Sequence, residues 1–308
     1  MANEGRRTLI AKIAAFSKVY KTRILHEGEA YELAKKCCTN ACRDVDVWTT
    51  VKGSSWLALI FVLDRAFYQG RRDELSGAFE LAAIAALKKI LEDPWSDLFV
   101  RKIENYKRKE FLDFKFKGKG NEGWESYREK WGSGNPLIPV LEDKYPIREK
   151  ERQVGKPRDR EMIVSTLNLI SESARRHDYN FLKYSVEKIR DGEIQDLHGE
   201  LTEIRQISEK IASLILRDIV LIFLPELDSE EKLGKEDYEL LQPIDTWVRQ
   251  ITRKYLSLDG KGDRKLRKSI VEACLRTRPR TSPILFNAGA WYLGKHSLDI
   301  AMEYLRKK

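Results

Sequence analysis

Two segments of the chain contain residues that could act together as an amine nucleophile and a carboxylate partner. Lys210 lies in Ile204–Ser213, a segment that predicts a short helix, a tight turn and a second helix with this lysine in its first turn. Asp245 lies in Pro243–Val248 and is predicted to begin another helix. A lysine amine attacks carbon only when it is neutral, and its ordinary pKa is about 10.4. Burial and the positive end of a helix both lower that pKa, so the position of Lys210 suits a nucleophile.

The elements that must position Lys210 and Asp245 are predicted to be helices. Apolar residues recur at helical spacing from Leu9 to Tyr20 and form one apolar stripe. The same periodicity predicts helices over 56–67, 78–91, 163–175, 179–189, 211–223, 246–256, 266–275 and 283–305. Gly70 and Asp93–Pro94 are expected to end the first two of these. Because strands and helices do not alternate along the chain, we expect an all-α fold.

The segment 201–255 resembles the helix-hairpin-helix DNA glycosylase superfamily. The hairpin of that superfamily follows a Leu-Pro-Gly-Val-Gly-x-Lys-x-Ala pattern, and its catalytic aspartate lies in a Val-Asp-Thr-His type of segment. Lys210 falls on the lysine and Asp245 on the aspartate. The resemblance implies two helical subdomains with a helix-hairpin-helix motif and a cleft between them.

The chain departs from this pattern in the hairpin and in the segment that follows it. Gln206 and Ser208 replace the two glycines, and Arg205 replaces the proline. Glycine suits such a turn because it adopts positive φ and lets a phosphate approach the backbone N–H groups. Without these glycines, the hairpin is expected to bind DNA more weakly. Lys210 and Asp245 are 35 positions apart, a long gap that the archaeal 8-oxoguanine glycosylases of the superfamily also have. The acidic run 224–231 fills part of it.

The resemblance also implies subdomain boundaries. The terminal subdomain would comprise 1–30 with 243–308, and the central subdomain would comprise 31–242. The helix-hairpin-helix would occupy 199–223, and a loop-rich basic insertion would occupy about 105–158.

The implied activity is that of a base-excision repair glycosylase with an associated AP lyase. Such an enzyme flips a damaged base, with an oxidised purine as the candidate here, out of duplex DNA. Lys210 would attack C1′ and form a Schiff base, and strand cleavage by β-elimination would follow. Asp245 would stabilise the charge that develops on the sugar or help to deprotonate the amine. The turn residues implied to hold a phosphate are Gln206, Ile207, Ser208 and Glu209.

Two further basic segments are candidates for DNA contacts. Arg276, Arg278 and Arg280 alternate with other residues in one short loop, whose alternative interpretation is an ordinary solvated loop. The second segment, 106–156, is rich in Gly, Pro, charge and aromatic residues, and its candidate contacts are Lys115, Lys117 and Lys119. Within it, 114–117 is compatible with a short strand with one basic face. The alternative is a solvated insertion whose aromatic residues anchor it to the body.

The motif Gly118–Gly123 fits GxGxxG, but no second strand and crossover follow it. A dinucleotide site needs that βαβ context, so we expect a flexible basic turn instead.

Composition favours a polyanionic partner. The chain has 308 residues, with 57 Lys and Arg against 48 Asp and Glu, for a formal net charge of +9. Together with this charge, the resemblance implies duplex DNA with a damaged base as the partner, and we expect a monomer. The N-terminal segment has no apolar run of signal-peptide length and no apolar run reaches membrane-spanning length, so we expect a cytoplasmic protein without a membrane partner.

No metal or cofactor is expected. Cys37, Cys38, Cys42 and Cys274 do not form paired CxxC sets, so they are predicted to be free cysteines in helices rather than ligands of an iron–sulfur cluster. The four histidines, at positions 26, 177, 198 and 296, lack the spacing of a zinc site.

Several interpretations without catalysis are also compatible with the sequence. Lys210 is also compatible with a surface lysine and Asp245 with a plain helix cap, and Asn287 and Trp291 are predicted to belong to the core. The whole chain is also compatible with a non-catalytic nucleic-acid-binding relative or with a helical protein-interaction module.

Overall fold

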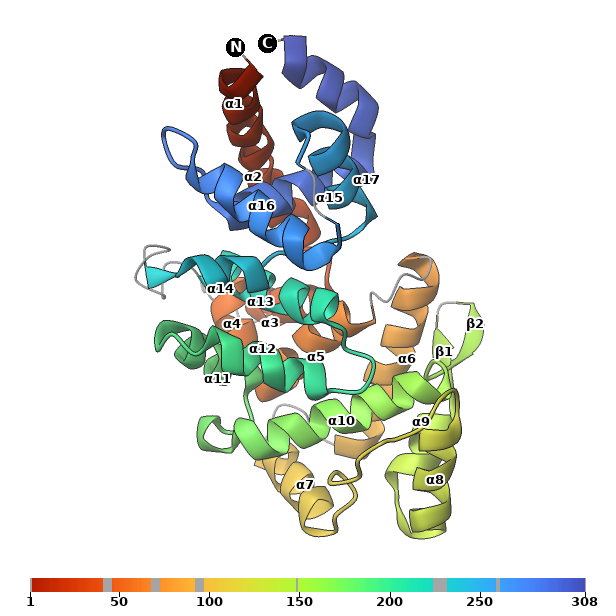
Figure 1. Cartoon of the computed structure of the whole chain (residues 1–308). Helices are drawn as coiled ribbons and strands as arrows, with labels where there is room; N and C mark the ends of the chain where they lie inside the picture. Colours follow the sequence, from red (N-terminus) through yellow and green to blue (C-terminus); the bar gives the residue numbers. More distant parts are fainter. Residues whose placement is uncertain are drawn as a thin grey trace. The chain divides into compact units, whose positions relative to one another are not determined.

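The protein folds almost entirely into helices, as Figure 1 shows for a computed structural model of the chain. The structure describes residues 2–40, 46–67, 73–91, 97–147, 149–223, 232–258 and 261–307. Within these ranges the only sheet is a two-stranded antiparallel hairpin, in which Lys144 pairs with Gln153 and Ile147 with Lys150. The expected all-α class is therefore confirmed.

The chain divides into two compact units. Unit 1 comprises 1–27, 188–198 and 212–308, and unit 2 comprises 28–187 and 199–211. Unit 1 thus contains most of the expected terminal subdomain. It also contains 188–198 and 212–242, which were expected in the central subdomain.

Unit 1 is built around the packing of its first and last helices (Figure 1). Its elements are α1 (Ala2–Ala15), α2 (Ser17–Val19), η1 (Tyr20–Ile24), most of α13 (Glu209–Phe223), α14 (Lys235–Leu240), α15 (Thr246–Gln250), η6 (Ile251–Tyr255), α16 (Asp263–Leu275) and α17 (Pro283–Lys307). Apolar residues of α1, α15, η6, α16 and α17 form one buried cluster. A glycine is needed where α17 crosses the end of α1, because a Cβ on Gly289 would lie 2.0 Å from the carbonyl oxygen of Ile13.

Unit 2 contains the remaining helices and the hairpin. Its elements are α3 (Glu29–Asn40), α4 (Val47–Gly53), α5 (Ser55–Ala66), α6 (Asp73–Leu91), α7 (Asp97–Arg108), α8 (Glu122–Trp131), η2 (Gly132–Gly134), α9 (Leu137–Glu142), β1 (Lys144–Ile147), β2 (Lys150–Gln153), α10 (Pro157–Ser173) and η3 (Arg175–His177). Two more helices, α11 (Phe181–Arg190) and α12 (Ile194–Glu203), contribute residues to both units, as α13 does. In α5 every residue from Trp56 to Ala66 is buried, so this helix forms the centre of the unit 2 core.

The apolar periodicity located the long helices correctly. The predicted helices over 56–67, 163–175, 211–223 and 283–305 correspond to α5, α10, α13 and α17. The helix breakers expected at Gly70 and Asp93–Pro94 lie outside the described residues.

The strand considered over 114–117 is wrong, because these residues form neither helix nor strand. Phe114 and Phe116 instead pack on the ring of Tyr127 in α8, at centroid distances of 5.2 and 5.3 Å. The segment before Gly118 is therefore not the strand that a dinucleotide site would need.

Candidate functional site

The turn between α12 and α13 keeps the backbone conformation of a glycine turn without a glycine. The N–H of Ile207 donates to the carbonyl oxygen of Ile204 at 3.0 Å, which closes the turn. Gln206 has φ of 71°, in the left-handed region that favours glycine. This residue occupies the first of the two expected glycine positions, so glutamine bears the strain there, which costs about 1–2 kcal/mol.

Lys210 lies in the first turn of α13, as the sequence predicted. Its side chain is half-buried, and it forms no hydrogen bond or ion pair with any residue that the structure describes. The next two residues, Ile211 and Ala212, are buried in the core. The amine therefore lies at the electropositive end of a well-anchored helix, and none of the described residues pairs with it.

The replacement of the hairpin proline by arginine links the turn to the basic loop. Arg205 donates from Nε to Oε2 of Glu161 at 2.8 Å and from Nη2 to the carbonyl oxygen of Gly118 at 2.6 Å. Glu161, in α10, is fully buried. A Cβ on Gly123 would lie 2.8 Å from Oε1 of Glu161, so the first turn of α8, directly after the loop, approaches this carboxylate closely. The turn and the loop were predicted from the sequence as two separate candidates for DNA contacts, whereas in unit 2 they lie side by side.

The loop from 113 to 121 separates its two kinds of side chain. Lys115, Lys117 and Lys119 are exposed, while Phe114 and Phe116 are half-buried against α8. The aromatic residues thus anchor the loop to the body of unit 2, as the interpretation of this segment as an anchored insertion predicts. The anchored loop still presents its three lysines to solvent.

Asp245 caps α15, which confirms one of its two expected roles. Its Oδ1 accepts from the N–H of Val248 at 2.8 Å, and the side chain is half-buried. The helix then continues through η6, so the two elements together cover 246–255 of the predicted 246–256. Asp245 belongs to unit 1, whereas Lys210 belongs to unit 2.

A buried polar network lies next to Asp245 within unit 1, and sequence reasoning missed it. Arg217 of α13 is fully buried. It donates to Oδ1 of Asp218 at 2.8 Å from Nη2 and 3.1 Å from Nε, to Oδ1 of Asn287 at 2.8 Å, and to the hydroxyl of Tyr20. Burial acts to lower the pKa of Arg217, but Tyr20, Asp218 and Asp245 together raise it above the ordinary value. The one available signal was a charged pair in an otherwise apolar helix.

Asn287 is a buried core residue, as predicted, and Trp291 is half-buried and packs against the core of unit 1. The amide nitrogen of Asn287 donates to the carbonyl oxygen of Pro243 at 3.3 Å, which ties α17 to the segment that precedes Asp245. The ring of Trp291 meets Tyr20 edge-on at a centroid distance of 5.5 Å.

The loop that follows α16 presents its three arginines outward. Arg276, Arg278 and Arg280 are exposed, and only Arg276 pairs with a carboxylate that the structure describes, that of Glu272 at 3.7 Å. Between them, the hydroxyl of Thr277 accepts from the N–H of Thr281 at 2.7 Å and closes the loop.

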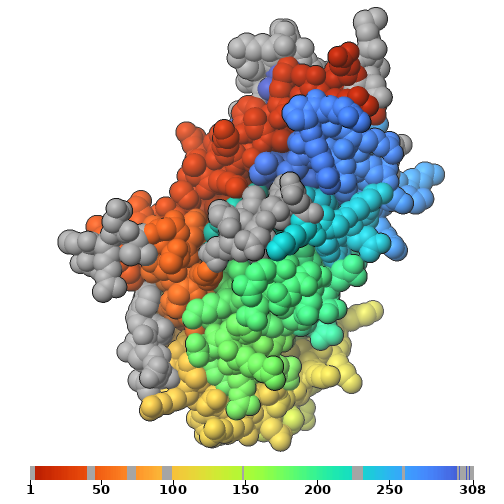
Figure 2. All heavy atoms as spheres, turned by 90° about the vertical axis from the view of Figure 1, so that its left-hand side faces the viewer, coloured from red at the N-terminus to blue at the C-terminus, as the bar shows by residue number. Residues whose placement is uncertain are grey.

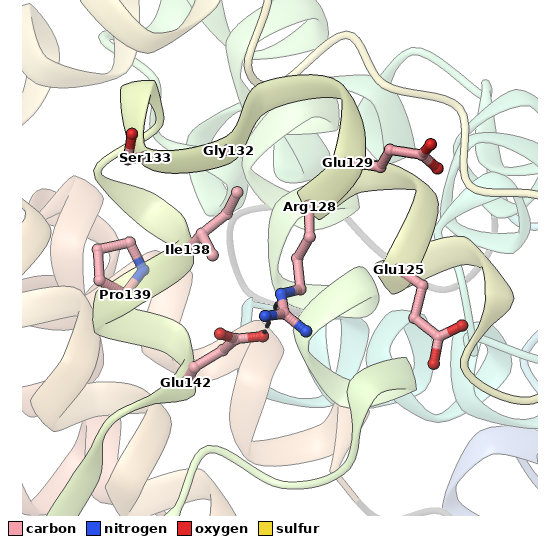
Figure 3. A pocket seen from close by; sticks show the side chains of 8 residues that line it. All are labelled: Glu125, Arg128, Glu129, Gly132, Ser133, Ile138, Pro139 and Glu142. Atoms are coloured by element: carbon pink, nitrogen blue, oxygen red, sulfur yellow. Dashed lines mark ion pairs between the residues drawn. The ribbon is translucent and has the colours of Figure 1, made fainter.

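A pocket of about 600 Å³ opens in unit 2 between α8, η2 and α9 (Figure 3). Its charged lining residues are Glu125, Glu129, Glu142 and Arg128, and Arg128 Nε pairs with Glu142 at 3.1 Å. Three carboxylates against one guanidinium repel phosphate, so this pocket is not a site for the DNA backbone.

Metal-binding and membrane features are not found among the described residues. Cys37, Cys38 and Cys274 are free cysteines in helices, and Cys42 lies outside the described residues. Burial raises the pKa of the Cys274 thiol. No cluster of His, Cys, Asp or Glu in the described ranges is suited to hold a metal ion. In the same ranges no helix combines the length and apolarity needed to cross a membrane.

No protein-family model, curated protein or solved structure matches the chain. The functional argument therefore rests on the residues described above.

Proposed function

We propose that this protein is a base-excision repair enzyme, a DNA glycosylase with AP lyase activity whose nucleophile is the amine of Lys210. The observation that carries the proposal is the turn before α13. It adopts positive φ at Gln206 and places Lys210 in the first turn of the following helix. Strained backbone of this kind is enriched at functional sites, which supports a role for this turn.

The setting of Lys210 supports a nucleophilic role. An ion pair or hydrogen bond would compete with a substrate for the amine, whereas Lys210 forms neither with any of the described residues. In the proposed reaction its nitrogen bonds to C1′ of the damaged nucleotide and loses a proton. The bond from C1′ to the base breaks, and the base leaves with the electron pair and takes up a proton. Opening of the sugar then gives a Schiff base, and loss of a proton from C2′ expels the 3′ phosphate.

The setting of Asp245 supports an assisting role. Its carboxylate accepts one N–H at the start of α15 and lies close enough to the Arg217 guanidinium to act on its charge. A fixed negative charge at this position would stabilise the cationic sugar that forms as the base departs.

A second candidate function is non-catalytic binding of nucleic acid. The observation that favours it is Arg205, whose guanidinium bonds to Glu161 and to the Gly118 carbonyl and so fastens the turn to the basic loop. Such a link serves a binding surface whether or not Lys210 reacts.

Reductive trapping distinguishes the two functions. Borohydride added during reaction with a duplex containing 8-oxoguanine should yield a covalent protein–DNA adduct, detected as a shifted band on a denaturing gel. Lys210→Gln should abolish the adduct while affinity for the duplex persists. Lys183 offers a matched control, because it is also a half-buried lysine in the first turn of a helix, α11.

The adduct should survive in Lys183→Gln. An adduct that persists in Lys210→Gln would assign the nucleophile to another amine. Binding without any adduct, over a panel of oxidised, deaminated and alkylated bases, would favour the non-catalytic function.

A further inference from the structure

The positive charge of this chain is concentrated in one short part of unit 1. Residues 251–282 contain ten Lys and Arg against three Asp and Glu, which gives this segment seven of the nine net positive charges. Six of the basic residues are exposed on α16 and on the loop that follows it. These six form what we call the α16 surface: Arg264, Lys265, Lys268, Arg276, Arg278 and Arg280.

We propose that the α16 surface binds the phosphate backbone of duplex DNA. This inference rests on the proposed function and deepens it, because it assigns to unit 1 a binding surface of which only the loop arginines were expected from the sequence. Figure 2 shows the side of the molecule on which the blue atoms of α16 and its loop reach the surface.

Two acidic residues near the α16 surface each form an ion pair with a basic residue outside it. Asp263 pairs with Arg249 at 2.6 Å, and Glu272 pairs with Lys235 at 2.7 Å. The hydrogen bond from Lys235 lowers the pKa of Glu272 below its ordinary value. Five of the six cations, all except Arg276, form no hydrogen bond or ion pair within the described ranges. Their charge is therefore available to an external anion.

The position of two of these cations is unfavourable for the helix itself. Arg264 and Lys265 lie in the first turn of α16, where the helix already carries partial positive charge. A basic side chain at that end loses the stabilisation that an acidic residue would bring. A phosphate bound there would relieve this repulsion and would contact the helix N-terminus as well.

The dimensions of the surface suit a nucleic-acid strand. The thirteen residues of α16 extend over about 20 Å, which matches about six nucleotides at 3.4 Å each. The arginines of the loop extend the basic path beyond the helix. Because guanidinium groups bind phosphate in a bidentate way, four arginines among six residues favour a phosphodiester partner.

A membrane surface fits less well than DNA. A helix that lies on a membrane inserts Trp, Phe or Leu between the lipids. The apolar residues of α16, among them Leu266, Ile270 and Cys274, are instead buried in the unit 1 core. Leu75, in unit 2, is the one exposed large hydrophobic residue in the described ranges.

The test measures binding to a lesion-free duplex of about 20 base pairs, so that the outcome is independent of catalysis. The triple variant Arg264→Gln/Lys265→Gln/Lys268→Gln should bind at least tenfold more weakly near 100 mM salt. The slope of log affinity against log salt should become shallower by roughly 0.9 for each lost phosphate contact. A control variant, Lys35→Gln/Lys36→Gln/Arg176→Gln, removes the same charge from exposed positions of unit 2 and should lose less than threefold.

Thermal unfolding excludes a folding defect, because removal of cations from the first turn of α16 should leave Tm unchanged or raise it. Equal losses in the α16 variant and the control would overturn the proposal, and so would α16-dependent binding to phosphatidylserine vesicles without binding to duplex. Duplex binding that depends on α16, combined with failure of the Lys210 trap, would overturn the enzymatic proposal alone.

Discussion

Each unit contains one buried cluster of ionisable side chains, and the two clusters compensate their buried charge differently. In unit 1 the guanidinium of Arg217 is compensated by a carboxylate, that of Asp218, and by neutral acceptors on Tyr20 and Asn287. In unit 2 the carboxyl group of Glu80 in α6 is buried and hydrogen-bonds to the carboxylate of Asp64 in α5.

In the unit 2 cluster Arg65 pairs with Asp64 at 3.5 Å, and the second acid, Glu80, is compensated by a proton. Two carboxyl groups can form a hydrogen bond only when one of them is protonated. Burial raises the pKa of Glu80 well above 4.5, and Asp64 and Glu29 raise it further against the opposing effect of Arg65. Asp64 in turn accepts from the N–H of Ala30 at 3.3 Å and from Nη1 of Arg65 at 3.5 Å.

The two clusters therefore differ in how their contribution to the fold depends on pH. The Arg217 cluster joins α13, η1, α17 and the segment before Asp245 through contacts that no change of pH near neutrality removes. It therefore acts as a fixed support for Asp245. The Glu80 cluster joins α5 to α6 through a bond that depends on pH.

The largest effect is expected for Arg217→Met. Removal of the guanidinium leaves Asp218 buried without its cation, and such a loss costs about 3–5 kcal/mol of the free energy of unfolding. Chemical denaturation followed by circular dichroism measures it. The double variant Arg217→Met/Asp218→Leu should recover part of the loss, because it removes both charges.

The exposed Arg276 provides the control for this comparison. Its ion pair with Glu272 spans 3.7 Å at the surface, so Arg276→Met should change stability by less than about 0.5 kcal/mol. Similar losses for the two arginines would mean that burial does not distinguish them.

A smaller effect is expected at Asp245, where two substitutions separate two roles. Asparagine caps a helix about as well as aspartate, so Asp245→Asn should retain stability, while Asp245→Ala should lose about 0.5–2 kcal/mol. Loss of the negative charge in Asp245→Asn should slow excision under single-turnover conditions by about a hundredfold. Full excision activity in a folded Asp245→Asn protein would leave this residue with its capping role alone.

Sequence periodicity predicted the helices because apolar residues at helical spacing must share one buried face. It predicted the turn before Lys210 and the cap at Asp245 because those depend on residues close together in the chain. It missed the contacts of Arg205 with Glu161 and Gly118, which join residues 44 and 87 positions apart. No local pattern specifies such pairs. The β1–β2 hairpin was missed because its strands, Lys-Tyr-Pro-Ile and Lys-Glu-Arg-Gln, are short and mostly polar.

The two buried clusters show the same limit. A charged pair such as Arg217–Asp218 in the apolar segment 211–223, or an acid in the apolar helix α5, indicates that further partners exist without identifying them. The partners of Arg217 come from η1 and α17, at separations of 197 and 70 positions. Only the folded chain identifies them.

The smallest effect is expected at Glu80, and its sign depends on pH. The folded protein keeps a proton on Glu80 that the unfolded chain releases near its ordinary pKa of 4.5. The contribution of this proton to stability is complete below about pH 4.5 and is lost as the pH rises from there through the raised pKa of the folded state. Glutamine is neutral at every pH and can still donate to Asp64. Glu80→Gln should therefore unfold at the same denaturant concentration as the wild type near pH 4 and at a higher one near pH 8.

The exposed Glu74 in the same helix serves as the matched control, and Glu74→Gln should not change the dependence of stability on pH in this way. The effect is smaller than that of Arg217→Met because the wild-type carboxyl group avoids burying its charge by keeping its proton, whereas Arg217→Met removes a buried guanidinium that bonds to Asp218, Asn287 and Tyr20. If Glu80→Gln were less stable than the wild type at pH 8, Glu80 would be ionised in the folded protein and the unit 2 cluster would be compensated by Arg65 after all. The two clusters would then bury charge in the same way.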